Sequence, residues 1–289
     1  MRIICAGCFL ASFDFDQAEG LRRMLAGPKP RIFTFLSATP DDEKSALLVN
    51  LSASLVKSGN QVLLFDARSG SRGVSSRLDM PHGATLQEVA RQERALNEAV
   101  RSMPQGFSVA TLARGRRIDA GDELHARRLA TTFRLLATQA DILVVDGELD
   151  DDDNLPISVL ATGEIIIQVS TSATSIKTAY TIVKRLNAQL GRRPFGILVT
   201  GANEQEAQVV YDNMSRASNR YLAVQLRSLG SVPADEHVRR AARLGRTVVD
   251  AFPLAGASVA FRRLAGRVAA PEMTSGLGGM ATAGANLVI

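Results

Sequence analysis

Cysteine is scarce in this chain of 289 residues, which contains only Cys5 and Cys8. Two cysteines exclude a disulfide framework, and a chain of this length buries a large enough core to fold without one. A zinc site at the Cys5-x-x-Cys8 pair would need further ligands, but the histidines are scattered (His82, His125 and His237). We therefore expect no metal site, and we interpret the pair as part of an N-terminal arm.

Long apolar runs are absent as well. None approaches the roughly 18 residues that a membrane span requires, and the apolar start at residues 1–11 is too short for a signal peptide. These observations favour a cytoplasmic location. The formal net charge is +5, from 34 Lys and Arg against 29 Asp and Glu. Such a mild excess is compatible with an anionic partner but does not by itself indicate one.

Composition divides the chain into three regions. Residues 1–30 form an arm that ends in the linker Gly27-Pro-Lys-Pro30, with a short helix expected from Asp14 to Ala26. Residues 31–269 alternate short apolar runs with helical patterns. Residues 270–289 are rich in glycine and other small residues, and we expect them to form a flexible tail.

The apolar runs of the central region predict strands buried on both faces of a sheet, because several of them are nearly continuous. The predicted strands are Ile32–Leu36, Gln61–Phe65, Phe107–Leu112, Asp141–Val145, Glu164–Val169, Phe195–Thr200 and Gln225–Val232. The predicted helices are Lys44–Lys57, Glu123–Gln139, Ser175–Leu190, Glu204–Ser218, Asp235–Leu244 and Ala257–Val268. This alternation predicts an α/β fold: a doubly wound, mainly parallel sheet with helices on both faces.

The loop after the first strand stands where a phosphate-binding P-loop would be. It reads Ser37-Ala-Thr-Pro-Asp-Asp-Glu-Lys44-Ser45, and Lys44-Ser45 open the next helix as the Lys-Ser/Thr pair of a P-loop does. A P-loop needs glycines so that its N–H groups can cradle the anion, whereas Pro40 has no N–H. Three acidic residues follow that repel phosphate, namely Asp41, Asp42 and Glu43. An ordinary strand–loop–helix connection with an acidic first turn is the alternative.

Two further strands end in an aspartate, Asp66 and Asp146. Because the ligand site of such sheets lies at the carboxyl ends of the strands, both carboxylates are expected beside Lys44. Aspartates in these places hold Mg²⁺ or orient water in P-loop NTPases. The alternative for either residue alone is a polar side chain that merely ends a strand.

The order and spacing of these segments resemble the MinD/ParA class of deviant P-loop ATPases, and among them the flagellar-number regulators of the FlhG/FleN type. Lys44-Ser-Ala-Leu-Leu-Val-Asn50 is similar to their first helix. Leu229-Gly-Ser-Val-Pro233-Ala-Asp-Glu-His-Val-Arg-Arg-Ala241 is similar to their "LGYIPxDxxVRRA" stretch. The resemblance implies a P-loop NTPase fold over residues 31–269, described as MinD-like, with nucleotide-site positions at Lys44, Ser45, Asp66 and Asp146.

The arm carries a second resemblance. Asp16-Gln17-Ala18-Glu-Gly-Leu21-Arg22 is similar to the N-terminal "DQAxxLR" motif of these regulators. The resemblance implies that this short helix docks on a signal-recognition-type flagellar GTPase and stimulates GTP hydrolysis. Gln17 would lie near the attacking water, Leu21 would be the apolar anchor and Arg22 would supply charge. A generic amphipathic helix is the alternative.

The sequence departs from the family at nearly every nucleotide-binding element. Where the family reads "KGGVGKT", the glycines are gone and Thr39 stands at the signature lysine. Arg68 replaces the second aspartate of switch I, switch II reads Asp146-Gly-Glu-Leu-Asp150, and Thr200 stands near the adenine-contacting asparagine. These departures predict a pseudo-ATPase with no catalytic residue and no cofactor. Nearby arginines that could offset the acidic residues are the counterargument: Arg68, Arg72 and Arg77.

The resemblance therefore predicts a regulator of flagellar number or placement that acts through protein contacts. Its expected partners are the flagellar GTPase and, beyond it, flagellar switch proteins or a transcriptional activator. The alternative is an active ATPase switch with a flagellar, cell-division-site or partitioning role, which would bind Mg-ATP through Lys44, Ser45, Asp66 and Asp146. A third interpretation is a partitioning or polysaccharide-synthesis relative with an accidental N-terminal match. The sequence does not distinguish a monomer from a homodimer.

Membrane and nucleic-acid contacts are two further interpretations of the basic residues. Val259–Val268 carries apolar and basic residues at the place of the family's membrane helix, which would put the protein peripherally at the inner membrane or the cell pole. We interpret it first as the last helix of the domain. Nonspecific DNA binding would need a clustered basic stripe. We interpret the candidate residues first as solvent-exposed residues on the surface of the domain. They are Arg114, Arg116, Arg117, Arg239, Arg240, Arg243 and Arg246.

Overall fold

The structure is a computed structural model. It describes residues 29–270 except 69–72, 81–82, 115–121 and 151. The predicted arm motif at Asp16–Arg22, the Cys5/Cys8 pair and the tail after residue 270 therefore lie outside the described residues.

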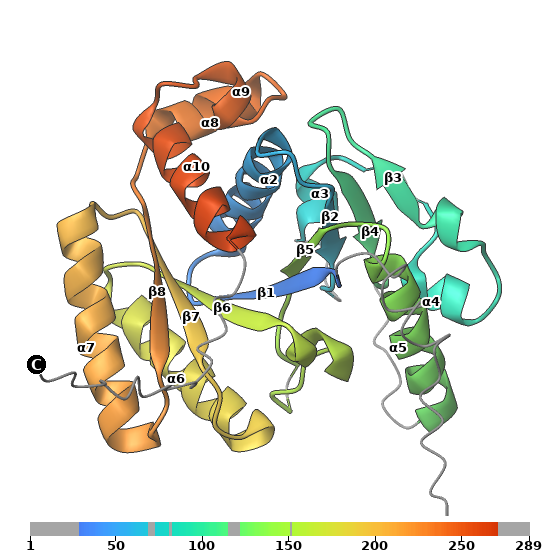
Figure 1. Cartoon of the computed structure of the whole chain (residues 1–289), viewed down its shortest axis with the longest axis horizontal. Helices are drawn as coiled ribbons and strands as arrows, with labels where there is room; N and C mark the ends of the chain where they lie inside the picture. Colours follow the sequence, from blue (N-terminus) through green and yellow to red (C-terminus); the bar gives the residue numbers. More distant parts are fainter. Residues whose placement is uncertain (1–28, 69–72, 81–82, 115–121, 151, 271–289) are drawn as a thin grey trace, which may run out of the picture.

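An eight-stranded sheet forms the centre of the described chain, in the order β3-β4-β2-β5-β1-β6-β7-β8 (Figure 1). Every neighbouring pair is parallel except β3–β4, which is antiparallel. The strands are β1 Arg31–Ser37, β2 Val62–Asp66, β3 Val100–Ser102, β4 Ser108–Thr111, β5 Ile142–Asp146, β6 Glu164–Val169, β7 Phe195–Thr200 and β8 Leu226–Val232. Each predicted strand is present, with its ends shifted by a single residue or not at all, and the predicted fold class is confirmed.

The helices connect these strands. They are α2 Asp41–Lys57, α3 Val74–Arg77, α4 Leu86–Ala90, α5 Glu123–Ala137, α6 Ala173–Leu190, α7 Glu204–Leu222, α8 Glu236–Arg243, α9 Val248–Ala251 and α10 Gly256–Ala269, with 3-10 turns at Leu96–Glu98 and Ser158–Thr162. The short elements β3, α3, α4 and α9 were not predicted, because segments of three to five residues are too short to show a hydrophobic period.

Helices cover both faces of the sheet (Figure 1). On one face α2 and α10 pack against side chains such as Phe35, Leu64 and Val144. On the other face α5 packs against Leu143 and Val145 of β5, and α6 and α7 cover β6 to β8. Successive residues of β5 therefore point into different cores, which explains why its sequence is apolar without interruption.

Two long-range contacts fasten the C-terminal helices to the first half of the chain. Asn50 in α2 is buried, and its Oδ1 accepts a hydrogen bond from the backbone N–H of Val248 at 2.7 Å, at the start of α9. The guanidinium of Arg31 donates to the carbonyl oxygens of Val268 and Ala270, both at 2.6 Å. Among the described residues no helix is long and apolar enough to cross a membrane.

Candidate functional site

The connection from β1 to α2 differs from the predicted loop. Strand β1 ends at Ser37 and α2 already begins at Asp41 with Pro40 as its N-cap residue (φ −55°, ψ 148°), so Lys44 and Ser45 lie one turn inside the helix. The prediction that Lys44-Ser45 open the helix is wrong. Proline's fixed φ suits the residue that enters a helix, and acidic residues stabilise its first turn.

Several backbone N–H groups in this connection donate hydrogen bonds within the protein. The N–H groups of Glu43 and Lys44 both donate to the carbonyl oxygen of Pro40, at 3.1 and 3.3 Å. The N–H of Thr39 donates to Oγ of Ser37 at 3.0 Å, and the two hydroxyl oxygens are 2.8 Å apart. Thr39, which stands at the family's signature lysine, therefore closes a local turn, and these N–H groups form no phosphate cradle.

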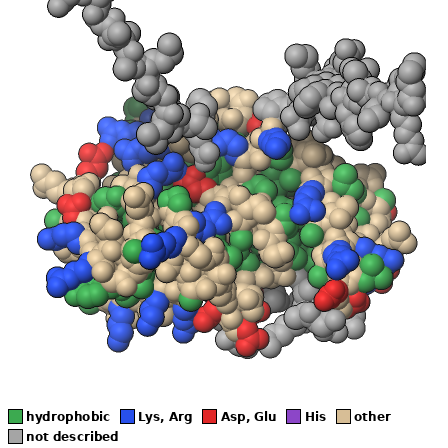
Figure 2. All heavy atoms as spheres, turned by 60° about the horizontal axis from the view of Figure 1, so that its bottom comes forward, with side chains coloured by type: hydrophobic (Ala, Val, Ile, Leu, Met, Phe, Trp, Pro, Cys, Tyr) green, Lys and Arg blue, Asp and Glu red, His purple; other side chains and the backbone are tan. Residues whose placement is uncertain are grey.

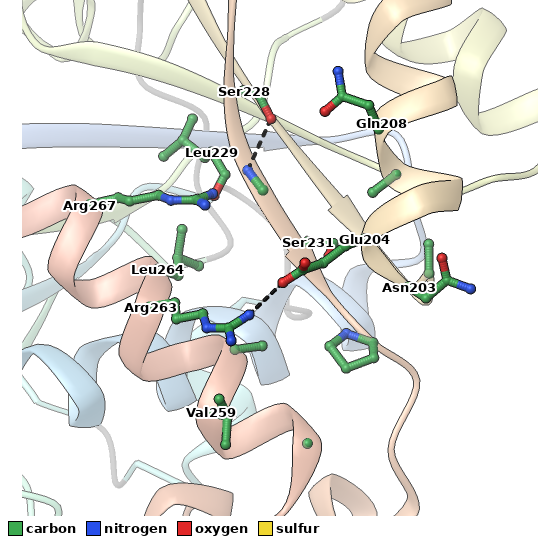
Figure 3. A pocket seen from close by; sticks show the side chains of 16 residues that line it. Asn203, Glu204, Gln208, Ser228, Leu229, Ser231, Val259, Arg263, Leu264 and Arg267 are labelled. Carbon is green, nitrogen blue, oxygen red and sulfur yellow. Dashed lines mark hydrogen bonds and ion pairs between the residues drawn. The ribbon is translucent and has the colours of Figure 1, made fainter.

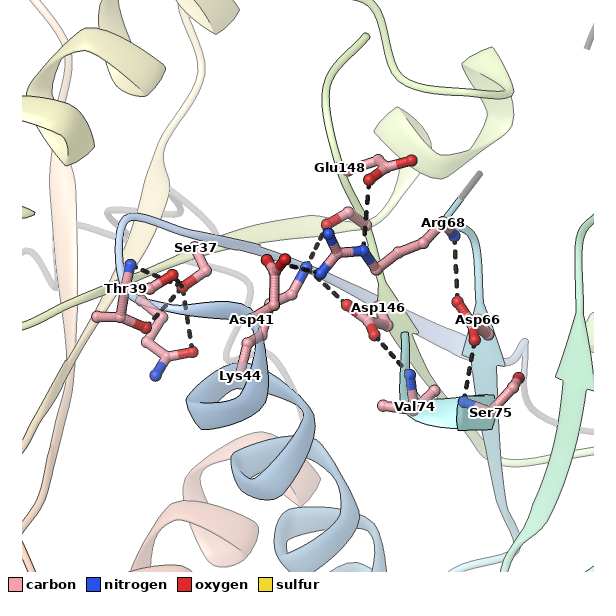
Figure 4. Close-up of polar contacts among 12 residues, drawn as sticks. Ser37, Thr39, Asp41, Lys44, Asp66, Arg68, Val74, Ser75, Asp146 and Glu148 are labelled. Atoms are coloured by element: carbon pink, nitrogen blue, oxygen red, sulfur yellow. Dashed lines mark hydrogen bonds and ion pairs between the residues drawn. The ribbon is translucent and has the colours of Figure 1, made fainter. Parts of the chain in front are cut away.

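The side chain of Lys44 turns inward. Its Nζ lies 2.6 Å from Oδ1 of Asp146 and donates to the carbonyl oxygen of Gly147 at 2.5 Å. The exposed fractions of the Lys44 and Asp146 side chains are 3% and 0%. The ammonium is therefore neutralised inside the protein, at the carboxyl ends of β1 and β5 (Figure 4).

Asp66 and Asp146 lie side by side, because β2 and β5 pair with these two residues in register. Asp66 accepts hydrogen bonds from the N–H of Arg68 at Oδ1 (3.2 Å) and of Ser75 at Oδ2 (3.0 Å). Oδ2 of Asp146 accepts from the N–H of Val74 at 3.0 Å. Together with the Lys44 ion pair, these contacts give each of the four carboxylate oxygens a partner within the chain.

Burial raises the pKa of the Asp66 carboxyl above its usual value, and repulsion from Asp146 raises it further; the hydrogen bonds from Ser75 and Arg68 oppose this. Gly73 allows the close approach of α3 to this carboxylate. A Cβ atom at Gly73 would lie 2.4 Å from both carboxylate oxygens of Asp66. No sequence pattern indicates a role for Gly73, because that role depends on which side chain the glycine faces in the folded chain.

Arg68 brings positive charge to the acidic first turn of α2, as the counterargument from sequence anticipated. Its Nη1 donates to Oδ1 of Asp41 at 2.8 Å, and its Nε lies 3.3 Å from Oε2 of Glu148. Burial acts to lower the pKa of the guanidinium, but the hydrogen bond to Asp41 and the carboxylates of Asp146, Asp41 and Glu148 raise it overall. Glu148 was not predicted to take part. Arg77 lies in α3, and Arg72 lies outside the described residues.

The predicted nucleotide-site residues thus converge at one edge of the sheet. Lys44, Ser45, Asp66 and Asp146 all lie at the carboxyl ends of β1, β2 and β5. The lysine and both aspartates are engaged with groups of the chain itself. Oγ of Ser45 is buried with no hydrogen-bond partner among the described residues. Within the part of the chain that the structure describes, no cluster of three or more His, Cys, Asp or Glu side chains could hold a metal ion.

A separate groove of about 390 Å³ runs along β8, between α7 and α10 (Figure 3). Arg263 of α10 pairs across it with Glu204 of α7. Arg267 of α10 donates to the carbonyl oxygen of Leu229 at 2.7 Å, and the N–H of Gly230 donates to Oγ of Ser228 at 3.2 Å. Side chains thus occupy two backbone groups of this edge strand, so these groups are not available to pair with another strand.

Two of the basic residues considered for DNA binding, Arg240 and Arg246, contact other groups of the chain. On the face in Figure 2, Lys and Arg side chains alternate with hydrophobic, acidic and other residues. Arg240 in α8 lies over the ring of Phe252 at 5.2 Å, and Arg246 donates to the carbonyl oxygen of Asp250 at 3.2 Å. Arg116 and Arg117 lie outside the described residues. DNA binding stays an untested prediction.

The parallel sheet, with β1 at its centre and a lysine–serine pair on the helix that follows, defines the class: a P-loop NTPase fold of the MinD/ParA type. MinD from Pyrococcus horikoshii complexed with Mg-ADP superposes with a TM-score of 0.62 at 21% identity, over 83% of this chain and 96% of that one. A chain of the Aquifex aeolicus MinC:MinD complex gives 0.63 at 20%, over 82% and 95%.

No family model matches the chain. The antiactivator FleN of Pseudomonas aeruginosa is 31% identical over 228 residues, which is 78% of this chain and 81% of that protein. The chain therefore belongs to the FleN family of MinD/ParA proteins, and the resemblance found in its sequence is confirmed. An uncharacterized ATP-binding protein of Methanocaldococcus jannaschii is 22% identical over 226 residues, 78% of this chain and 82% of that protein.

Proposed function

We propose that this chain is a regulator of flagellar number or placement that works through protein–protein contacts and does not hydrolyse ATP. The family supports a regulatory role, because its relative in Pseudomonas aeruginosa is an antiactivator. The flagellar role rests on the resemblance to the FlhG/FleN regulators. The absence of hydrolysis rests on the geometry at the carboxyl ends of β1, β2 and β5.

The buried ion pair between Lys44 and Asp146 carries the proposal. For Lys44 to reach a phosphate, it would have to leave Asp146 as a buried unpaired carboxylate, which costs about 3–5 kcal/mol. Micromolar binding amounts to only about −8 kcal/mol in total. A cost of that size removes about two to four orders of magnitude of affinity.

A titration of the full chain with a fluorescent ATP analogue and Mg²⁺ tests whether the site has lost nucleotide binding. We expect no saturable binding up to about 1 mM, which corresponds to roughly −4 kcal/mol. Ser45→Ala is the informative variant, because it removes a hydroxyl without a partner among the described residues and leaves the Lys44 ion pair intact. Lys57→Ala, on the exposed end of α2, is the control. Micromolar binding that Ser45→Ala weakens and Lys57→Ala does not would refute the proposed loss of nucleotide binding.

The arm motif supplies the proposed contact with the signal-recognition-type flagellar GTPase. Asp16, Gln17, Ala18, Leu21 and Arg22 match the motif of the family. We expect the full chain to accelerate GTP hydrolysis by that GTPase, and Gln17→Ala to abolish the acceleration. Glu19→Ala changes an unconstrained position of the motif and serves as the control. Equal stimulation by all three proteins would eliminate this role for Gln17.

A further partner of the same regulator is proposed from the role of its relative. Because the relative in Pseudomonas aeruginosa is an antiactivator, a transcriptional activator is favoured over flagellar switch proteins. Coexpression and copurification with the activator encoded in the same genome tests this. A stable complex that forms without added nucleotide is expected, since the site needs none. A complex that forms only with Mg-ATP would contradict the nucleotide-independent mechanism.

One observation favours the second candidate, an active Mg-ATP switch with a dimeric, membrane-associated or polar state. The hydroxyl of a P-loop Ser or Thr is a Mg²⁺ ligand, and the Ser45 hydroxyl is buried without a partner among the described residues. In that case the Lys44–Asp146 pair would open when nucleotide arrives. The Ser45→Ala titration separates the two candidates.

A further inference from the structure

Arg68 occupies a central place in the site that the family pattern does not explain. It follows β2, and its side chain is only 10% exposed. Figure 4 shows the guanidinium between the first turn of α2 and the segment after β5. The chain around it contributes the carboxylates of Asp41, Glu148 and Asp146, and the ammonium of Lys44.

Three segments of the chain meet at this one residue. The backbone N–H of Arg68 donates to Asp66 at the end of β2. Its Nη1 donates to Asp41 in α2, and its Nε faces Glu148 after β5. In P-loop NTPases, the γ-phosphate and its Mg²⁺ join the corresponding segments and release them on hydrolysis.

We propose that Arg68 is a built-in substitute for the nucleotide: it holds the first turn of α2 and the segment after β5 in a single arrangement, with or without nucleotide. This inference rests on the proposed function, since a permanently held site suits a regulator that does not cycle ATP. Arg68 acts as a positioning residue, and it touches no reactant.

The shape of the arginine side chain matters to the argument. A guanidinium is planar and presents separate N–H groups in a fixed fork, so Arg68 can bond Asp41 through Nη1 while Nε faces Glu148. An ammonium is a single compact charge and cannot span both carboxylates in that geometry. Arg68→Lys should therefore keep the charge and lose the bridge.

Hydrogen–deuterium exchange of the full chain, read by mass spectrometry, tests the proposal. In the native protein, we expect exchange at residues 41–44, 74–77 and 147–150 to be the same with and without about 1 mM Mg-ATP. Arg68→Ala should raise exchange at residues 41–44 and 147–150 by about tenfold, because losing the hydrogen bond to Asp41 and the ion pair with Glu148 lowers the free energy of local opening. Arg68→Lys should not restore protection. Arg239→Ala, on the exposed surface of α8, is the matched control.

A second set of variants distinguishes the bridge from a general loss of packing. Asp41→Asn with Glu148→Gln neutralises both partners and leaves Arg68 in place. We expect this double variant to reproduce the faster exchange, and Arg68→Ala to add little on top of it, because all three changes remove one interaction. Strictly additive effects, or unchanged exchange in Arg68→Ala, would overturn the proposal.

The outcomes also separate this inference from the proposed function. Nucleotide binding to the native protein with no change in exchange would refute the proposed loss of nucleotide binding and leave the bridge in place. Slower exchange at residues 147–150 on adding Mg-ATP to the native protein would overturn the bridge as a substitute for the nucleotide. Unchanged exchange in Arg68→Ala, with no ATP binding, would overturn the bridge alone.

Discussion

The ammonium of Lys44 and the carboxylate of Asp146 form a buried ion pair, with Nζ and Oδ1 2.6 Å apart and exposed fractions of 3% and 0%. The lysine comes from α2 and the aspartate from the end of β5. In a working P-loop, this lysine reaches outward to a phosphate. Here it is part of the interior, so its removal affects stability as well as any binding.

Lys44→Met should lower the free energy of unfolding by about 3–5 kcal/mol, because it leaves Asp146 charged, buried and unpaired. Urea denaturation measures the loss. Lys57→Ala is the matched control, since Lys57 also pairs with an aspartate, Asp250, at 2.6 Å, but is 49% exposed. That variant should cost less than about 1 kcal/mol. Similar losses in the two variants would show that the buried pair has no special role.

Asn50→Ala should lower the free energy of unfolding by about 1–3 kcal/mol, because it leaves the buried N–H of Val248 without its acceptor. It also removes the hydrogen bond to the carbonyl oxygen of Ala46. Asn213→Ala, at an exposed position on α7, is the control and should change stability by less than about 0.5 kcal/mol. Thermal unfolding of the native protein and the two variants measures these changes in stability. A negligible loss in Asn50→Ala would show that α9 is held by packing alone.

The long elements of the fold followed from the sequence, whereas the short ones did not. Runs such as Ile165–Ile167 and Ile142–Val145 are apolar because both faces of their strands are buried. Helix α9 has four residues, and it is fixed by Asn50, a residue far away in the sequence. Contacts of that kind leave no local pattern from which they could be predicted.

The members of the site could also be predicted, but their partners could not. Lys44, Asp66 and Asp146 were identified by their places at strand and helix ends. Whether the lysine points outward or into the protein depends on where α2 begins, and the acidic residues after Pro40 extend the helix backward. The pairing of Arg68 with Glu148 depends on two segments that meet only in the folded chain.

The raised pKa of Asp66 gives a prediction about pH. Between the ordinary pKa of 3.8 and the raised native one, the folded protein holds the Asp66 proton more strongly than the unfolded chain does. The contribution of Asp66 to stability is therefore fully present below pH 3.8, and it decreases as pH rises through this window. Asp66→Asn removes this contribution.

Urea denaturation of the native protein and of Asp66→Asn, between about pH 4 and pH 7, measures the contribution of Asp66 to stability. The unfolding free energy of the native protein minus that of Asp66→Asn should decrease with rising pH. A difference that stays level, or increases, would mean that the pKa of Asp66 is not raised in the folded state.

Gly230 in β8 gives the last prediction. Its φ of +93° is in the left-handed region, and a Cβ there would lie 2.1 Å from Nη1 of Arg267. Gly230→Ala should therefore lower the free energy of unfolding by at least about 1–3 kcal/mol, through backbone strain and displacement of Arg267 from the carbonyl oxygen of Leu229. Adding Arg267→Ala removes the clash but leaves the strain, so the double variant should stay less stable than Arg267→Ala alone.

Gly266→Ala, in α10, is the matched glycine control. A Cβ at Gly266 would meet nothing within 4 Å, and the position is inside a helix with an ordinary φ. The same chemical change should there raise the free energy of unfolding by up to about 1 kcal/mol, because alanine favours the helix and restricts the unfolded chain. Chemical denaturation of the two single variants should thus give opposite signs. A loss at Gly266, or a gain at Gly230, would contradict the backbone geometry described for α10 or β8.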